Sequence, residues 1–161
     1  MKNQKGFSLI ELLIVVAIIL IIAAIAIPNL IRSKMAANEA SAVASLRTIN
    51  TGEVTYNNTY PGSFASLAAL GPSAQTCTTP SSTNACLIDW LLANANSTAQ
   101  GKSGYYFAIT TTATTYASEA EPMTPGSTGT RGFCSDQNLV LYYKAVGGGM
   151  GTCTTANGTA L

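Results

Sequence analysis

A chain of 161 residues can form one compact domain together with an anchoring segment. Only 9% of its residues are charged and the formal net charge is +1, so the composition gives no electrostatic case for binding nucleic acid. The sequence has no histidine, which excludes Ser-His-Asp and Cys-His catalysis and removes the commonest protein ligand for metals. We therefore expect no enzymatic activity, no cofactor and no metal site.

The longest apolar stretch of the chain lies near its N-terminus, at residues 7–27. Every residue from Leu12 to Ile27 is apolar, which makes the stretch long enough to be a candidate membrane span. Its one charged residue is Glu11, and Lys2 and Lys5 precede it. A carboxylate at the centre of a bilayer costs about 2.5–3.5 kcal/mol on insertion scales, so an acid in a span is functional by default. We expect Glu11, near one end of the stretch, to have a partner.

Residues 6–18 and 23–28, which read GFSLIELLIVVAI and AAIAIP, closely resemble the class III signal of type IV pilins and type II secretion pseudopilins. The resemblance is strong over residues 1–35 and weak beyond them. It implies that a prepilin peptidase removes the leader at residues 1–6 by cutting between Gly6 and Phe7, and then methylates the new N-terminus at Phe7. The helix at residues 7–31 would anchor the subunit in the inner membrane and later form the core of a helical filament.

A filament core would give Glu11 a specific role in assembly. Buried among apolar helices, its carboxylate would be an unpaired charge that costs several kcal/mol. The resemblance implies that it pairs with the N-terminal amine of Phe7 in a neighbouring subunit, which would fix the axial register of the subunits. The simpler alternative is that Glu11 faces lipid headgroups near the membrane surface.

An ordinary secretory signal peptide is the other interpretation of this stretch. Lys2 and Lys5 would form its n-region, and residues 12–23 its h-region. Residues 24–26 read A-I-A and would be the cleavage site, so the mature chain would begin at Ile27. Glu11 is unsuited to an h-region and the helical pattern continues past residue 26, so we favour the pilin interpretation.

Pro28 follows the apolar stretch. A proline inside a helix removes one backbone hydrogen bond and clashes with the preceding turn, which predicts a kink. Pilins have a kink at this proline, and in some filaments the helix before it is melted. Many relatives carry a glycine in the middle of the run, whereas this chain has Leu20, which speaks against an extended melted segment.

The second half of the helix is expected at residues 32–60. Its alanines favour a helix, and its large apolar residues keep near-helical spacing, which predicts one apolar stripe. The stripe comprises Val43, Leu46, Ile49, Tyr56 and Tyr60. The charged residues are expected mostly off that stripe: Arg32, Lys34, Glu39, Arg47 and Glu53.

Residues 61–161 are expected to form a globular head. The patterns predict short helices at 63–70 and 87–92, with Trp90 as a core residue rather than a binding residue. Strands are expected at 104–111, 115–120, 133–136 and 139–145, followed by a flexible Thr/Gly tail. The predicted fold class is α+β, a long N-terminal helix packed on a small antiparallel sheet of about four strands, which is the pilin architecture.

The four cysteines allow three pairings and, with the membrane signal, point to an oxidising compartment. We favour Cys77–Cys86 and Cys134–Cys153, because each pair closes one local loop. The second bridge would pin the C-terminal tail to the sheet, as a C-terminal disulfide does in many pilins. Basic residues on both sides of the span leave the positive-inside rule undecided, so the cysteines and the resemblance place the C-terminal part outside the cytoplasm.

Residues 102–136 also resemble the head of major pseudopilins, which often bind calcium through an acidic C-terminal loop. The corresponding loop here offers only Asp136, and a calcium site needs several charged oxygen ligands, so we predict none. This difference favours a pilus subunit over a secretion pseudopilin.

The predicted function is polymerisation: the chain would be the structural subunit, and the major pilin, of an extracellular type IV pilus. Its expected partners are further copies of itself in a helical filament, the inner membrane before assembly, the prepilin peptidase and the pilus assembly machinery. The alternatives within the family are a type II secretion pseudopilin and a minor pilin. The alternative of another class is a membrane-tethered or secreted binding module, such as an adhesin or a DNA-uptake factor.

Overall fold

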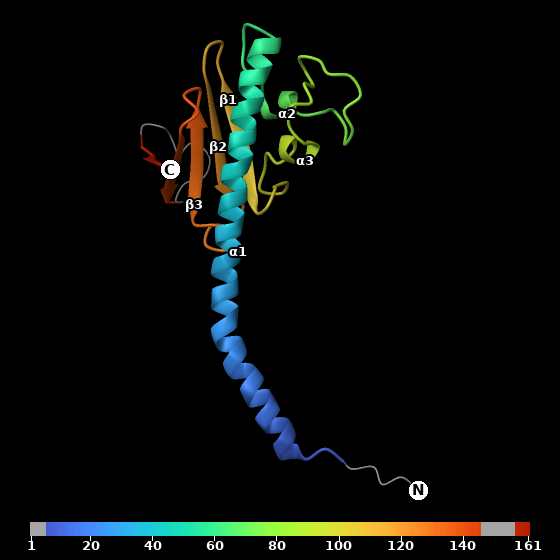
Figure 1. Ribbon diagram of the computed structural model, residues 1–161, viewed down its shortest axis with the longest axis vertical. Coiled ribbons are helices and arrows are strands. Elements are labelled where there is room, and N and C mark those ends of the chain that lie inside the picture. The colour runs from blue at the N-terminus through green and yellow to red at the C-terminus, as the bar shows by residue number, and fades with distance from the viewer. Residues whose placement is uncertain (1–5, 146–156) are drawn as a thin grey trace. The chain divides into compact units, whose positions relative to one another are not determined.

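The computed structural model describes residues 6–145 and 157–161. The α+β class predicted from the sequence is confirmed (Figure 1). The described chain contains three helices and five strands, in the order α1 (Leu9–Thr59), α2 (Leu67–Leu70), α3 (Trp90–Ala93), β1 (Tyr105–Thr111), β2 (Tyr116–Pro122), β3 (Arg131–Asp136), β4 (Leu141–Ala145) and β5 (Thr159–Ala160). The chain divides into two compact units, Met1–Lys34 and Met35–Leu161, and we describe each by itself.

Helix α1 is one uninterrupted element of 51 residues that includes Pro28. No melted segment occurs between Leu9 and Thr59, which agrees with the expectation drawn from Leu20. The sequence supports this length because the helix contains one internal glycine, Gly52, and many alanines and leucines, which have high helix propensity. The kink expected at Pro28 stays a prediction.

The five strands form one antiparallel sheet in the order β1-β2-β3-β4-β5. The β1–β2 turn is held by Thr112, whose backbone N–H donates to the Thr115 carbonyl at 2.8 Å. In the β3–β4 turn the Leu139 N–H donates to the Asp136 carbonyl at 2.9 Å, and Leu139 adopts a positive φ of 64°. Both turns lie where the sequence predicted them.

Strand β5 was not predicted, because the C-terminal residues were expected to form a flexible tail. Thr159 and Ala160 instead pair with Tyr143 and Tyr142 of β4. Two residues with no alternating apolar pattern carry no strand signal of their own, so only the edge of β4 determines their conformation.

The hydrophobic core of Met35–Leu161 lies between the second half of α1 and the sheet, with α2 and α3 closing one side (Figure 1). Leu46 and Ile49 are fully buried, as the apolar stripe predicted. They pack with large side chains of the sheet and of the short helices: Leu70, Leu92, Tyr105, Phe107 and Phe133. Each such side chain contributes about 1.5–3 kcal/mol when it is removed from water.

Three expectations about this core were wrong. Glu39 and Glu53 were placed mostly off the buried stripe, yet they are 6% and 0% exposed. Trp90 was expected in the core, yet it is only half-buried and begins α3, which starts three residues later than expected. The helix start moves because the Asp89 side chain accepts the Leu92 N–H at 3.0 Å and so acts as the N-cap.

Asn50 fixes the position of α1 on the sheet. Its Nδ2 donates to Ser135 Oγ at 2.8 Å, and its Oδ1 accepts from the Tyr116 hydroxyl at 3.1 Å and from Ser118 Oγ at 3.4 Å. All four side chains are buried. Because an unsatisfied buried polar group costs about 1–3 kcal/mol, a shift of the helix along the sheet would be unfavourable.

Candidate functional site

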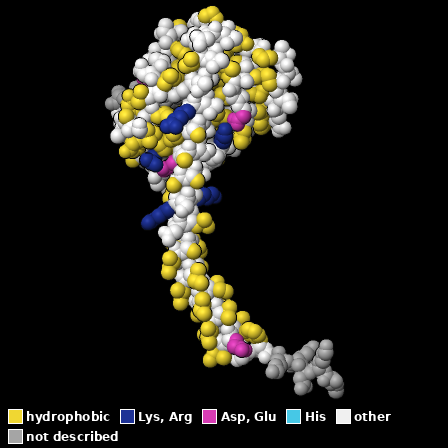
Figure 2. All heavy atoms as spheres, viewed as in Figure 1, with side chains coloured by type: hydrophobic (Ala, Val, Ile, Leu, Met, Phe, Trp, Pro, Cys, Tyr) yellow, Lys and Arg dark blue, Asp and Glu magenta, His cyan; other side chains and the backbone are white. Residues whose placement is uncertain are grey.

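The apolar half of α1 is the most unusual surface of the described chain. Its large side chains from Leu9 to Ile31 are between 46% and 80% exposed, and Figure 2 shows hydrophobic side chains covering this stretch. By length and composition it could cross a membrane, and none of the most apolar part is buried within the protein. A contiguous apolar surface of this size marks a membrane or protein contact.

The N-terminus of α1 is closed by a capping interaction that the sequence analysis missed. The backbone N–H of Ser8 donates to Glu11 Oε2 at 2.9 Å, and the Ser8 carbonyl accepts from the Leu12 N–H at 3.3 Å. Ser8 occupies the N-cap position and Glu11 the third helical position, the spacing of a capping box. The pattern Ser-x-x-Glu at the start of an apolar run was the available signal. Glu11 therefore already has a partner within its own chain.

Gly6 and Phe7 lie before the helix, in non-helical backbone. Both are exposed, and Phe7 is 76% exposed. A Cβ added at Gly6 would meet no atom within 4 Å, so nothing in the fold requires glycine there. The structure thus brings the three predicted processing and assembly residues, Gly6, Phe7 and Glu11, to one end of α1, whereas Pro28 lies inside the helix.

The disulfide between Cys77 and Cys86 is present as expected, with Cα atoms 5.9 Å apart. It closes the loop between α2 and α3. The other expected bridge joins Cys134, which is buried in β3, to Cys153, which lies outside the described residues. That pairing stays a prediction.

A partly buried ion pair fastens the β2–β3 loop and the start of β3 to α1. Glu39 Oε2 accepts from Arg131 Nε at 2.8 Å and Nη2 at 2.6 Å, and Glu39 Oε1 accepts from the N–H and the hydroxyl of Thr130 at 2.9 and 3.0 Å. Burial by itself would raise the pKa of Glu39, but the bonds from Thr130 and Arg131 outweigh it, so the pKa lies below its ordinary value of 4.5. The Arg131 guanidinium also lies over the rings of Phe133 and Tyr143, 5.7 and 5.3 Å from their centres. This cluster serves the fold, because both Glu39 oxygens already accept hydrogen bonds and the Arg131 guanidinium already has its partners.

Glu53 is the other buried acid of α1. Its Oε2 accepts from the Ala65 N–H at 2.9 Å, which holds the segment leading into α2 against the helix. Its Oε1 is buried and has no hydrogen-bond partner. Burial raises the pKa of Glu53 to about 7, although the Ala65 hydrogen bond opposes that shift.

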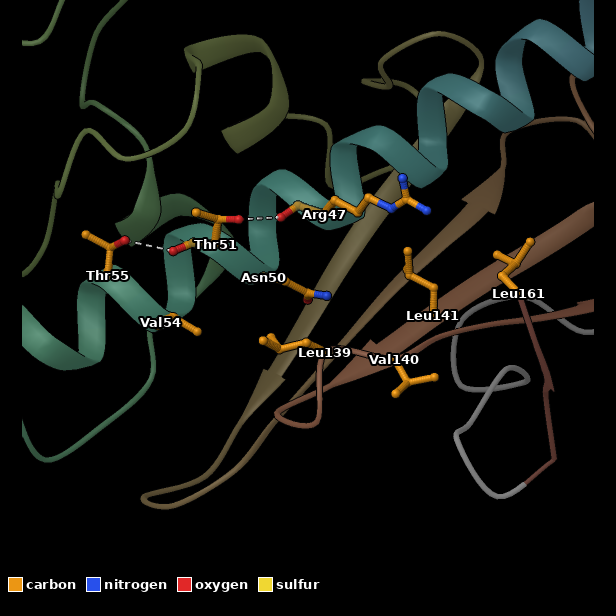
Figure 3. Close-up of a pocket in the computed structure, with 9 residues that line it drawn as sticks. All are labelled: Arg47, Asn50, Thr51, Val54, Thr55, Leu139, Val140, Leu141 and Leu161. Atoms are coloured by element: carbon orange, nitrogen blue, oxygen red, sulfur yellow. Dashed lines mark hydrogen bonds between the residues drawn. The ribbon is translucent and has the colours of Figure 1, made fainter.

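A groove of about 550 Å³ runs beside the second half of α1 (Figure 3). Arg47, Asn50 and Val54 line it from the helix, and the β3–β4 turn, β4 and the C-terminal residue form its other wall. Four of its apolar side chains are 41–58% exposed: Val54, Leu139, Val140 and Leu161. Its lining carries one cation and no acid, an arrangement suited to packing against another surface and not to acid–base chemistry.

No group of three or more metal-ligating side chains comes together in the part of the chain that the structure describes. Two of the acids in the described residues form ion pairs that hold the fold together: Glu39 with Arg131 and Asp89 with Lys102.

Comparison with known proteins gives one family match and several similar proteins. The family described as "Prokaryotic N-terminal methylation motif" matches residues 1–27. The chain is similar to "Type IV wide pilus major component PilA4" of Thermus thermophilus, with 46% identity over 74 residues, 44% of this chain and 56% of that protein. It is also similar to "Type IV major pilin protein PilA" of Myxococcus xanthus, with 46% identity over 54 residues, 34% of this chain and 24% of that protein.

A third relative belongs to a secretion system. "Type II secretion system core protein G" of Pectobacterium carotovorum is 33% identical over 71 residues, 42% of this chain and 46% of that protein. The chain thus spans about half the length of two of these relatives and about a quarter of the other. No solved structure matches. The resemblance to type IV pilins and secretion pseudopilins inferred from residues 6–28 is confirmed.

Proposed function

We propose that this chain is a structural subunit, the major pilin, that polymerises through the apolar half of α1 into an extracellular type IV pilus. The proposal rests on the exposed apolar run from Leu12 to Ile27. This run is preceded by Gly6, a glycine that the fold itself does not require. A helix of that composition has to be covered, first by lipid and then by other helices of the same kind. The methylation motif and the similarity to major pilins support the same function.

Processing would begin at the Gly6–Phe7 bond. The bond lies in exposed, non-helical backbone immediately before the Ser8 cap, where an extended segment can enter a protease. The requirement for glycine would then come from a prepilin peptidase and not from the fold. The same enzyme would methylate the amine of Phe7. Before processing the subunit would sit in the inner membrane, with Met35–Leu161 on its outer side.

Assembly would use Glu11. In the single chain its carboxylate accepts from the Ser8 N–H, which satisfies one of its oxygens near the end of the span. In a filament core, the amine of Phe7 from a neighbouring copy would add the opposite charge that a buried carboxylate needs. This pairing would fix the axial register of the subunits, because only one axial offset brings the Glu11 carboxylate and the Phe7 amine together. In this proposal the prepilin peptidase carries out the chemistry, and the chain has no enzymatic activity of its own.

The first experiment is to shear cells, collect the high-molecular-weight material, and measure the N-terminus and intact mass of the chain in it. A start at Phe7 with one added methyl group, in sheared filaments, is the expected result. A soluble chain starting at Ile27 would show that residues 24–26 are a signal-peptide site and would refute the proposal.

Glu11→Ala tests the assembly role. We expect the variant to be cut and methylated normally, because the scissile bond is unchanged, and to assemble poorly. Filament yield should fall about tenfold or more, since an amine in the core then lacks its counter-charge. Filament yield equal to that of the native chain would remove Glu11 from the assembly mechanism.

A secretion pseudopilin is the second candidate, because the chain is also similar to core protein G of a type II secretion system. Location separates the two functions: a pilin is recovered in filaments sheared from the cell surface, whereas a pseudopilin stays in the cell envelope. A minor pilin would be recovered in sheared filaments at a small fraction of the main subunit. A membrane-tethered binding module would have the same N-terminus but would not sediment as a filament.

A further inference from the structure

A small cleft of about 310 Å³ lies beside α3, between that helix, the turn at residues 94–101 and Met123. It lies far along the chain from the N-terminal helix and plays no part in the proposed polymerisation. Its volume is at the low end of the range for small-molecule sites. Trp90, the single tryptophan of the sequence, lines it.

The walls of this cleft are held in place by hydrogen bonds. Asp89 caps α3 and also pairs with Lys102, with Nζ and Oδ2 3.1 Å apart. The Ala95 carbonyl accepts from the Phe107 N–H at 2.6 Å, which ties the turn to β1. At Gly101 an added Cβ would clash with Met123 Sδ and with the Tyr105 carbonyl oxygen, so only glycine lets Met123 reach this position. The cleft is therefore formed before any ligand arrives.

One part of the lining is apolar. Trp90 and Met123 are half-buried and Leu91 is 51% exposed. Trp90 does not belong to the buried core of Met35–Leu161, although a tryptophan gains most when it is fully covered. The three side chains leave an aromatic and aliphatic surface that a ligand with an apolar face could cover.

The other part of the lining is polar but uncharged. Asn94 and Gln100 contribute side-chain amides, each of which can both donate and accept hydrogen bonds. Asn94 Nδ2 donates to the Trp90 carbonyl at 2.8 Å, which orients the amide and leaves its oxygen as the acceptor. Gln100 is exposed, and its backbone, not its side chain, forms the Ser97–Gln100 turn. No lining residue is charged, and the adjacent Lys102 and Asp89 neutralise each other.

We propose that this cleft binds a neutral sugar ring. A hexose presents C–H groups on one face and hydroxyl groups at its edge, which matches an aromatic surface flanked by amides. An anionic or cationic ligand would lose its hydration and find no counter-charge among the lining residues. A purely apolar ligand would leave the two amides without partners. The site would let an assembled filament bind carbohydrate surfaces, but it does not depend on the filament proposal.

The lone tryptophan provides a direct test. The full-length chain is kept in a phosphocholine detergent, whose head group is not a sugar, and Trp90 emission is followed during titration. The probes are glucose, galactose, mannose, N-acetylglucosamine and N-acetylgalactosamine. At least one should give a saturable change with a Kd in the millimolar range, the strength expected for a ligand of about a dozen non-hydrogen atoms. Cyclohexanol, which has the apolar ring but a single hydroxyl, should bind about tenfold more weakly than that sugar.

Gln100→Ala keeps the reporter and removes one amide. The affinity for the sugar that responds should fall about fivefold, the loss of one hydrogen bond. Gln75→Ala removes an exposed amide from the loop between Cys77 and α2 and is the matched control; its affinity should equal that of the native chain. Circular dichroism checks that both variants are folded.

The proposal is overturned if none of the five sugars gives a saturable change. It is also overturned if cyclohexanol binds as tightly as the sugars, which would indicate a purely apolar hollow. Equal effects of Gln100→Ala and Gln75→Ala would show that the sugar binds elsewhere. Because processing and filament assembly are not involved in these measurements, failure here leaves the proposed function untouched.

Discussion

The two halves of α1 are one continuous helix but have opposite relations to their surroundings. From Leu9 to Ile31 the large side chains are exposed and apolar on all sides, and the one acid, Glu11, sits in the first turn. From Met35 to Thr59 one face is buried, and that face includes two acids, Glu39 and Glu53. A helix that is apolar all round needs an apolar partner, whereas a helix with one buried face already has its partner. The comparison shows that the second half serves the fold, and it supports the proposal that the first half serves contacts between molecules.

A lysine substitution in each half of α1 should give the largest difference between the two halves. Ile19→Lys puts a charge into the middle of the apolar run and should disfavour membrane insertion by about 3–4 kcal/mol. Val54→Lys changes a residue of similar exposure, 43% against 58%, in the second half and should leave insertion unchanged. The membrane-integrated fraction after carbonate extraction measures both. Equal insertion of the two variants would mean that the apolar run is not a membrane span.

Glu53 should make the stability of the second half depend on pH. Its folded-state pKa, about 7, lies above the ordinary value of 4.5, so protonated Glu53 is favoured by folding. The stabilising contribution is therefore complete below pH 4.5 and is lost as the pH rises through 7. Over that window the free energy of unfolding should fall by about 3 kcal/mol.

Glu53→Gln isolates that effect, because glutamine can still accept the Ala65 N–H and does not titrate. Urea unfolding of the full chain in detergent, followed by Trp90 emission, should show a flat profile between pH 5 and 8 for the variant. Glu39 has the opposite sign: its pKa is lowered, so its contribution is present above pH 4.5 and is lost as the pH falls below it. A native profile that is flat above pH 5 would contradict the burial of an ionisable Glu53.

Arg131→Ala should destabilise the second half by leaving Glu39 buried without its cation. The expected loss is about 2 kcal/mol, less than the 3–5 kcal/mol of a fully buried pair, because the Arg131 side chain is 42% exposed. Arg47→Ala, which removes an arginine with no ion-pair partner among the described residues, should change stability by less than about 0.5 kcal/mol. Urea unfolding at pH 7 distinguishes them; equal midpoints would mean that the ion pair contributes nothing.

Ser8→Ala should have the smallest effect and act only on the first half. Loss of the N-cap should cost about 1 kcal/mol and weaken the first turn of α1. Hydrogen exchange of the amides at residues 9–12 should accelerate about fivefold, while exchange in the second half stays the same. Ser8→Thr, which keeps a hydroxyl at the N-cap position, is the control. Unchanged exchange in Ser8→Ala would show that Glu11, not Ser8, holds the helix end.

Much of the fold could be predicted because its signals are local. The apolar run, the proline and glycine breaks after Tyr60 and the apolar residues at 139–143 are all local signals. A helix and a strand were found there, although β4 begins at Leu141, two residues later than expected. The cap at Asp89 and the capping box at Ser8 are local as well, and were overlooked. Trp90 was misplaced because large apolar residues usually go inside, and sequence alone does not show that Leu92 and Ala93 take the core positions of that short helix.

The sequence alone determined the division of α1: a long apolar run with one acid defines the N-terminal half without reference to the rest of the chain. Only the tertiary structure determined whether the acids in the second half are buried and which charge they carry. The sequence placed Glu39 and Glu53 mostly off the apolar stripe, but whether a carboxylate is buried depends on groups distant in the chain. Arg131 and Thr130 make Glu39 a fixed anion, whereas Ala65 gives Glu53 one hydrogen bond and leaves its other oxygen buried without a partner. Electrostatic partners brought together by folding, and not the pattern along the helix, determine the charge each acid carries.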